Sequence, residues 1–177
     1  MAATHAPPGP LTAQDQRLGP WRAFLLAHAR VARRLDDELR AAHDLSFAEY
    51  DALLTIATAP ERRIRMRQLA DRVLLSKSGV TRLIDRLVVD GLVERDSCVS
   101  DARGAEAVLT EAGLDRLRVA STTHLRGISD HFLDVLDDQQ LAEVGRAMQA
   151  VAERAGAGPG DPGLCLPDEG APSEREA

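Results

Sequence analysis

The 177-residue sequence predicts a mainly α-helical fold with a small β-hairpin, an α+β arrangement. Between residues 15 and 155, apolar side chains recur mostly every three to four positions, which is the spacing of amphipathic helices. After Gly91 the spacing changes to about two over "LVERD" and "AEAVLT", as expected for strands. Hydrophobic residues make up 44% of the chain but aromatic residues only 3%. The core is therefore expected to be aliphatic, which suits helices packed on helices.

Composition and motifs argue against several classes of protein. The sequence shows no signal peptide and no run of 18 apolar residues, so we expect a cytoplasmic protein without a membrane partner. Cys98 and Cys165 have no CxxC spacing and are interpreted as unrelated thiols in a reducing compartment. Because Gly-rich phosphate loops, GxSxG and HExxH are all missing, we predict no enzyme, no catalytic residues, no cofactor and no metal.

The two ends of the chain differ from its middle. Residues 1–14 and 156–177 are rich in Pro, Gly and Ala and lack any period, so both are predicted to be disordered tails. The first predicted helix covers about residues 15–43. Ser46 and Glu49 have the spacing of a capping box, which predicts the start of a second helix that ends at Pro60.

Seven further elements follow. Residues 64–66 are a candidate short strand, "MRQLADRV" a two-turn helix, and Ser76 the N-cap of a helix that runs to Asp90 and is closed by Gly91. The two strand-like runs form a hairpin around the polar "SCVSDARG". Thr110 caps a long helix and Asp137 the last one. This order is that of a winged helix-turn-helix with long N- and C-terminal helices.

The helix over residues 76–90 has two different faces. Val80, Leu83, Ile84 and Leu87 form an apolar face that is expected to pack inward. The outward face carries Lys77, Ser78, Thr81, Arg82 and Asp85. A helix with cations and hydroxyls on its outer face fits the major groove of B-DNA.

The distribution of charge supports the same interpretation. The net charge of the chain is −6, yet residues 62–103 hold ten basic and six acidic residues, a net +4. The remaining residues therefore carry −10. Positive charge is concentrated where DNA would lie, and the acidic remainder is expected to face away from phosphate.

Each candidate DNA contact has a predicted role. Arg82 is the candidate for base contact, and Asp85 either accepts from a cytosine amine or, as we favour, orients Arg82 or Arg86. Arg103, beside Asp101 at the hairpin tip, fits a minor groove. The candidates for contact with bases or phosphates are Arg67, Ser76, Lys77, Ser78, Thr81, Arg82, Arg86, Asp101 and Arg103, among which Arg67 and Ser76 are assigned to phosphate.

The run "LADRVLLSKSGVTRLIDRLVVDGLVERDSCVSDARGAEAVLTEAG" resembles the MarR family of bacterial transcriptional regulators. The matching elements are Gly91-Leu92-Val93-Glu94-Arg95, Asp101-Ala102-Arg103 and Leu109-Thr110-Glu111-Ala112-Gly113, and the likeness covers about residues 20–155. The resemblance implies a homodimer on a pseudo-palindromic site, often released by a small ligand or an oxidant. It also implies a dimerisation region over residues 15–45 and 111–155 and a DNA-binding domain over residues 46–110.

Several alternatives stay open at this point. Trp21 either fills the dimer seam or walls a pocket for an aromatic effector, and His28 is either structural or neutralises an anionic one. Cys98 lies at the wing base, where the resemblance to oxidant-sensing members suggests redox control. His124, His131 and Asp134 are too widely spaced for a compact metal chelate. The leading interpretation is a DNA-binding repressor, and the alternatives are a redox-responsive regulator and a winged-helix protein-interaction module.

Overall fold

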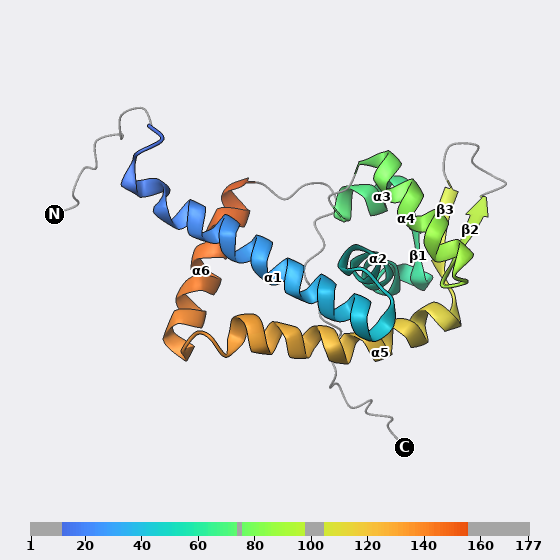
Figure 1. The fold of residues 1–177 in the computed structure, drawn as a ribbon. Helices are drawn as coiled ribbons and strands as arrows, with labels where there is room; N and C mark the ends of the chain where they lie inside the picture. Colours follow the sequence, from blue (N-terminus) through green and yellow to red (C-terminus); the bar gives the residue numbers. More distant parts are fainter. Residues whose placement is uncertain (1–11, 74–75, 98–104, 156–177) are drawn as a thin grey trace, which may run out of the picture.

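The computed structural model describes residues 12–73, 76–97 and 105–155, and it confirms a mostly helical fold with one small antiparallel sheet (Figure 1). The winged part lies around one end of α1, and α6 lies toward the other. The elements are η1 (Gln16–Leu18), α1 (Gly19–His43), α2 (Phe47–Ala57), η2 (Pro60–Arg62), β1 (Arg63–Arg65), α3 (Met66–Arg72), α4 (Lys77–Val89), β2 (Val93–Ser97), β3 (Ala105–Leu109), α5 (Glu111–Ile128), η3 (Ser129–Leu133) and α6 (Asp138–Ala155).

The long first helix is half covered. Its C-terminal half packs on α5, where a Cβ on Gly127 would lie 2.6 Å from both the Leu35 side chain and a Glu38 carboxylate oxygen. A larger residue at this position would require the ends of these two side chains to move. The N-terminal half of α1, residues 19–30, is exposed along its whole circumference.

The predicted capping box starts α2. Ser46 Oγ accepts a hydrogen bond from the Glu49 amide at 3.2 Å, and Glu49 Oε2 accepts one from the Ser46 amide at 2.8 Å. The helix that follows is largely buried, because it contacts α1, α5, α4 and the sheet. It is the central element of the fold. The largest fully buried side chains are Leu39, Leu53, Ile56, Leu69, Ile84, Leu87, Val80 and Val93.

The sheet has three strands in the order β1-β3-β2. The predicted hairpin is confirmed, with Arg95 opposite Ala107 in its register. The short strand begins one residue earlier than expected and pairs with β3, so that Ile64 lies opposite Ala107 on the other side. Burial of Ile64 and Ala107 attaches this small sheet to the helical core.

The predicted helix ends are confirmed at α4, α5 and α6. Gly91 closes α4 with a φ of 70°, a left-handed conformation that glycine adopts without strain. Thr110 Oγ1 accepts from the Gly113 amide at 2.9 Å, and Asp137 Oδ1 from the Gln140 amide at 2.8 Å. After α5 the structure departs from the prediction, because a π-helical turn, η3, follows where continued α-helix was expected.

Candidate nucleic-acid interface

Helix α4 presents the two faces that its sequence predicts. Ser76 Oγ accepts from the Gly79 amide at 3.1 Å and so fixes the first turn. Val80, Ile84 and Leu87 are buried, and Leu83 is half-buried. Ser78, Thr81, Arg82 and Asp85 are exposed, and the Lys77 side chain lies outside the described part of the structure. The outward face of α4, as far as the structure describes it, is therefore polar and exposed to solvent.

Helix α3 packs against α4 as the first helix of the helix-turn-helix pair. Leu69 and Ala70 face the core, whereas Arg67 is exposed in the first turn of α3. Within the described ranges, neither Arg67 nor Arg82 has an ion-pair partner. Two guanidinium groups on this helix pair are thus available for phosphate or base contacts.

Asp85 has a different partner from the one predicted. Its Oδ1 lies 2.8 Å from Arg95 Nη1 of β2, and Arg95 Nη2 also donates to the Thr81 carbonyl at 3.2 Å. We expected Asp85 to orient Arg82 or Arg86, and the structure instead joins it to the wing strand. The cause is tertiary, since β2 packs alongside α4 and brings Arg95 to the carboxylate.

Arg86, predicted to contact DNA, lies against α2 in this structure. Its Nη1 donates to Glu49 Oε1 at 2.8 Å. Burial of Glu49 acts to raise the pKa of its carboxyl, but hydrogen bonds from Ser46 and the nearby Arg86 guanidinium outweigh burial, and the pKa lies below its ordinary value. Glu49 is therefore ionised and bound at neutral pH. Sequence reasoning assigned Glu49 only to the capping box.

The arginines near the sheet are largely paired with carboxylates. Arg63 Nη1 lies 3.5 Å from both Asp96 Oδ2 and Glu106 Oε2, and Arg65 Nε lies 3.8 Å from Glu106 Oε1. These contacts cross all three strands and hold the base of the wing. Asp101, Arg103 and Cys98 lie outside the described residues, and their predicted roles stay predictions.

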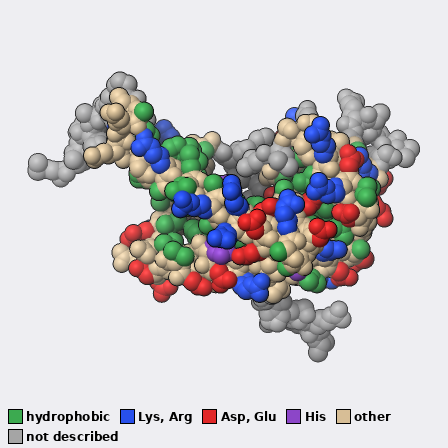
Figure 2. All heavy atoms as spheres, in the orientation of Figure 1, with side chains coloured by type: hydrophobic (Ala, Val, Ile, Leu, Met, Phe, Trp, Pro, Cys, Tyr) green, Lys and Arg blue, Asp and Glu red, His purple; other side chains and the backbone are tan. Residues whose placement is uncertain are grey.

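An exposed apolar surface lies away from the winged part, and we define it by α1, η3 and α6. Figure 2 shows hydrophobic side chains gathered over the N-terminal half of α1. Trp21 is 56% exposed. The ring centroids of Trp21 and Phe24 are 5.9 Å apart, and those of Phe24 and His28 are 6.2 Å apart. The exposed large apolar side chains of this surface are Trp21, Phe24, Leu25, Leu26, Phe132, Leu133, Met148 and Val151.

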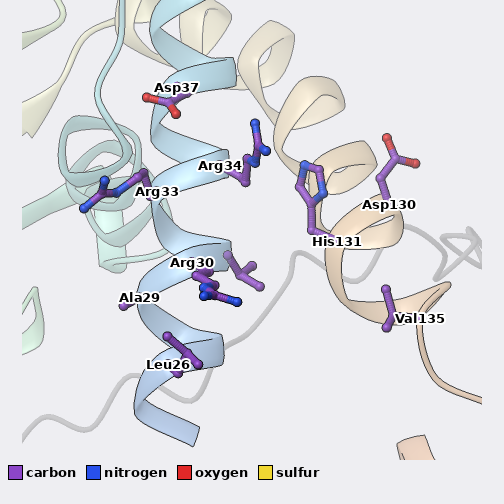
Figure 3. A pocket seen from close by; sticks show the side chains of 10 residues that line it. Leu26, Ala29, Arg30, Arg33, Arg34, Asp37, Asp130, His131 and Val135 are labelled. Atoms are coloured by element: carbon purple, nitrogen blue, oxygen red, sulfur yellow. The ribbon is translucent and has the colours of Figure 1, made fainter. Parts of the chain in front are cut away.

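A groove of about 880 Å³ lies between α1 and η3 (Figure 3). Arg34 of α1 and His131 of η3 face each other across it, and Arg30 and Arg33 also line it. Among the residues that the structure describes, these three arginines have no ion-pair partner. Trp21 and His28 do not line this groove. Sequence reasoning missed the arginines, although "ARVARR" places three of them within five helical positions.

The three residues considered as metal ligands, His124, His131 and Asp134, lie in separate environments. His124 is buried with its ring centroid 4.4 Å from that of Tyr50, and burial lowers its pKa. His131 Nε2 lies 2.6 Å from Glu38 Oε1, and Asp134 accepts from Ser129 Oγ at 3.2 Å.

Across the described ranges, no helix is long and apolar enough to cross a membrane.

The chain is similar to known regulators over most of its length. The sequence profile of the MarR family matches residues 43–104. AbsC, a MarR family transcriptional regulator from Streptomyces coelicolor, is 31% identical with a TM-score of 0.73, over 82% of this chain and 98% of that one. Sco3205, from the same organism and solved in complex with DNA, is 31% identical with a TM-score of 0.72, over 83% and 94%. The Escherichia coli HTH-type transcriptional regulator PrsX is 26% identical over 133 residues, 71% of this chain and 79% of that protein. The chain therefore belongs to the MarR family of transcriptional regulators.

Proposed function

We propose that this protein is a homodimeric repressor that binds a pseudo-palindromic operator and is released by a small anionic effector. The observation that carries the proposal is the outward face of α4, where Ser78, Thr81 and Arg82 are exposed on a helix whose other face is buried. Arg82 has no ion-pair partner among the residues that the structure describes. A guanidinium in this position can donate two hydrogen bonds to a guanine edge in the major groove. The similar protein Sco3205 was solved in complex with DNA, which supports the same use of this fold.

Dimerisation is proposed from the exposed apolar surface on α1, η3 and α6. A soluble monomer rarely leaves so many large apolar side chains on one continuous region. A second copy would cover them with the same surface, related by a twofold axis. Two copies of α4 would then reach successive major grooves on one side of a duplex, about 34 Å apart. We further propose that Arg103 of each wing enters the adjacent minor groove.

The proposed effector site is the groove between α1 and η3. Arg30, Arg33 and Arg34 bring three positive charges to a space that Asp37 and Asp130 also line, so positive charge is in excess. Leu26 and Val135 give the same space apolar walls. A carboxylate on an apolar body matches that combination, because guanidinium groups bind carboxylates with paired hydrogen bonds. Benzoate is the simplest probe of this chemistry. It should weaken operator binding by the wild type but not by a variant in which Arg30 and Arg34 are both replaced by Gln.

The class of function is tested by a mobility-shift assay with DNA from upstream of the protein's own gene and with random DNA. We expect preference for the upstream fragment, and affinity that falls about tenfold or more per doubling of salt if about four to six phosphates are contacted. Repression follows if this site overlaps a promoter and added protein reduces transcription in vitro. A salt-independent response without preference would contradict DNA binding and favour a protein-interaction module.

A further inference from the structure

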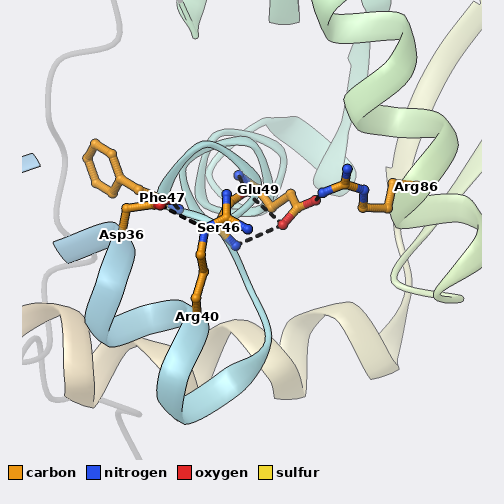
Figure 4. Close-up of polar contacts among 6 residues, drawn as sticks. All are labelled: Asp36, Arg40, Ser46, Phe47, Glu49 and Arg86. Atoms are coloured by element: carbon orange, nitrogen blue, oxygen red, sulfur yellow. Dashed lines mark hydrogen bonds and ion pairs between the residues drawn. The ribbon is translucent and has the colours of Figure 1, made fainter. Parts of the chain in front are cut away.

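A buried carboxylate joins the recognition helix to the centre of the fold. Glu49 projects from the first turn of α2, and Arg86 reaches it from α4 with an Nη1 to Oε1 distance of 2.8 Å (Figure 4). The Glu49 side chain is only 6% exposed, whereas that of Arg86 is 63% exposed. A largely exposed arginine of α4 is therefore linked to a buried anion of α2.

The anion itself is held rigidly. Glu49 Oε2 accepts from the Ser46 amide at 2.8 Å and from Ser46 Oγ at 2.7 Å, which leaves Oε1 for Arg86. Ionised donors and acceptors form shorter and stronger hydrogen bonds than neutral ones. A carboxylate with three donors has one allowed position, so the guanidinium that binds it is also positioned.

The same turn of α2 is tied to the long first helix. Asp36 Oδ1 of α1 accepts from the Phe47 amide at 2.8 Å, and Asp36 Oδ2 lies 2.7 Å from Arg40 Nε (Figure 4). Polar contacts thus run from α1 through the first turn of α2 to α4. Helix α1 carries much of the proposed dimer surface, and α4 carries the proposed DNA-reading face.

From these contacts we propose that Glu49 is a positioning residue for operator recognition, acting through Arg86 to hold α4 at the angle that the dimer presents to DNA. The inference rests on the proposed DNA-binding function. Arg86 then stabilises the complex without donating to a phosphate or base. The next side chain along α4 makes a second link, because Asp85 pairs with Arg95 of β2, so α4 is joined both to the wing strand and to α2.

The test compares Glu49→Gln, Arg86→Gln and the double variant in titrations of the operator and of random DNA across salt. Gln at position 49 can keep the capping-box bonds from Ser46 with its carbonyl oxygen, but it removes the charge and places an amide NH2 donor opposite the Arg86 guanidinium. We expect each single change to weaken operator binding by about tenfold, the double change to be no worse than either single one, and the salt dependence to stay unchanged. Binding to random DNA should change little, because it depends on phosphate contacts rather than on the angle of α4. Arg86→Lys should restore part of the lost affinity.

Arg118→Gln is the matched control. It removes one arginine from an exposed ion pair with Asp115 on α5, and it should bind the operator as the wild type does. Thermal unfolding and sedimentation of every variant confirm that titrations are made on folded dimers. A variant that is unfolded at the titration temperature is measured at a lower one.

Two results would overturn the inference. If Glu49→Gln binds the operator like the wild type, then Glu49 does not position α4. If Arg86→Gln reduces the salt slope by about one phosphate contact while the two changes add, Arg86 touches DNA directly. A wild-type protein without operator preference would instead refute the proposed function, so the two failures are distinguishable.

Discussion

At the scale of single residues, Arg82 has the environment expected of a base-reading side chain. It is exposed on α4, and no carboxylate in the described part of the chain pairs with it. Arg82→Ala should therefore remove discrimination between operator and random DNA, worth about 1–3 kcal/mol, while leaving the dimer intact. Competition titrations measure that ratio, with Arg118→Ala as the control. An Arg82→Ala protein that still selects its operator normally would exclude Arg82 from base readout.

His124 makes stability depend on pH. Burial between Tyr50 and Phe47 lowers the pKa of its imidazole, so the folded protein favours the neutral form. As pH falls through about 6.5 the unfolded chain binds a proton first, and the free energy of unfolding decreases by at most about 1.4 kcal/mol per pH unit until the folded pKa is reached.

Denaturant unfolding at about pH 7.5 and about pH 5.5 checks this dependence. In His124→Phe the free energy of unfolding should depend less on pH than in the wild type, because an apolar ring in the same place does not titrate. His28→Gln changes an exposed histidine of α1, and its free energy of unfolding should change with pH as that of the wild type does. Equal slopes for wild type and His124→Phe would show that another group is responsible.

Sequence reasoning identified which side chains of α4 face outward, but not which of them pair within the protein. Helical periodicity separates Val80 and Ile84 from Thr81 and Arg82, since it depends only on neighbours along the chain. The pairs Asp85–Arg95 and Glu49–Arg86 join elements distant in sequence, 10 and 37 positions apart. Periodicity carries no information about such contacts, so Arg86 was assigned to DNA, with Asp85 rather than Glu49 as its possible partner.

At the scale of elements, local signals predicted helix starts well. Ser46, Ser76, Thr110 and Asp137 all cap the helices expected, because a cap depends on a few adjacent residues. The π-helical turn of η3 and the pairing of β1 with β3 were not predicted. Both involve contacts with distant segments, namely the His131–Glu38 contact for η3 and the edge of the hairpin for β1.

The wing is proposed to contact the minor groove of DNA. Arg63 and Arg65 are paired with carboxylates at its base, so Arg103 is the arginine proposed to reach DNA. Arg103→Ala should weaken operator binding with a smaller loss of selectivity than Arg82→Ala, since minor-groove contacts read sequence less fully. Salt-dependent titrations compare the two. Unchanged affinity would show that the wing does not enter the groove.

At the scale of the whole molecule, the acidic chain has a basic region that is proposed to face DNA. Residues 62–103 carry a net +4 in a chain of net charge −6. Much of the basic charge near the sheet is paired with Asp96, Glu106 and Glu111. Arg67 of α3 and Arg82 of α4, in contrast, are exposed without an ion-pair partner in the described part of the chain. This distribution favours one orientation of the protein on a duplex.

The proposed dimer is tested by placing a charge on its apolar surface. Leu25 is exposed on α1 in the single chain, so Leu25→Glu should leave the monomer folded and destabilise the dimer by burying an unpaired carboxylate. Sedimentation velocity of Leu25→Glu should show monomers. Its affinity for the operator should fall, because each monomer then binds a single half-site on its own. Val119→Glu makes the same exchange on α5, outside this surface, and should remain dimeric. A dimeric Leu25→Glu protein would place the interface elsewhere.

Two copies of α4 are proposed to lie in the major groove of one duplex. Methylation of guanine N7 blocks only the major groove, so an interference experiment on the operator reports contacts there directly. We expect interference at two clusters of guanines on one side of the duplex, about 34 Å apart from centre to centre. Binding that is unaffected by methylation of any guanine in the operator would contradict this geometry.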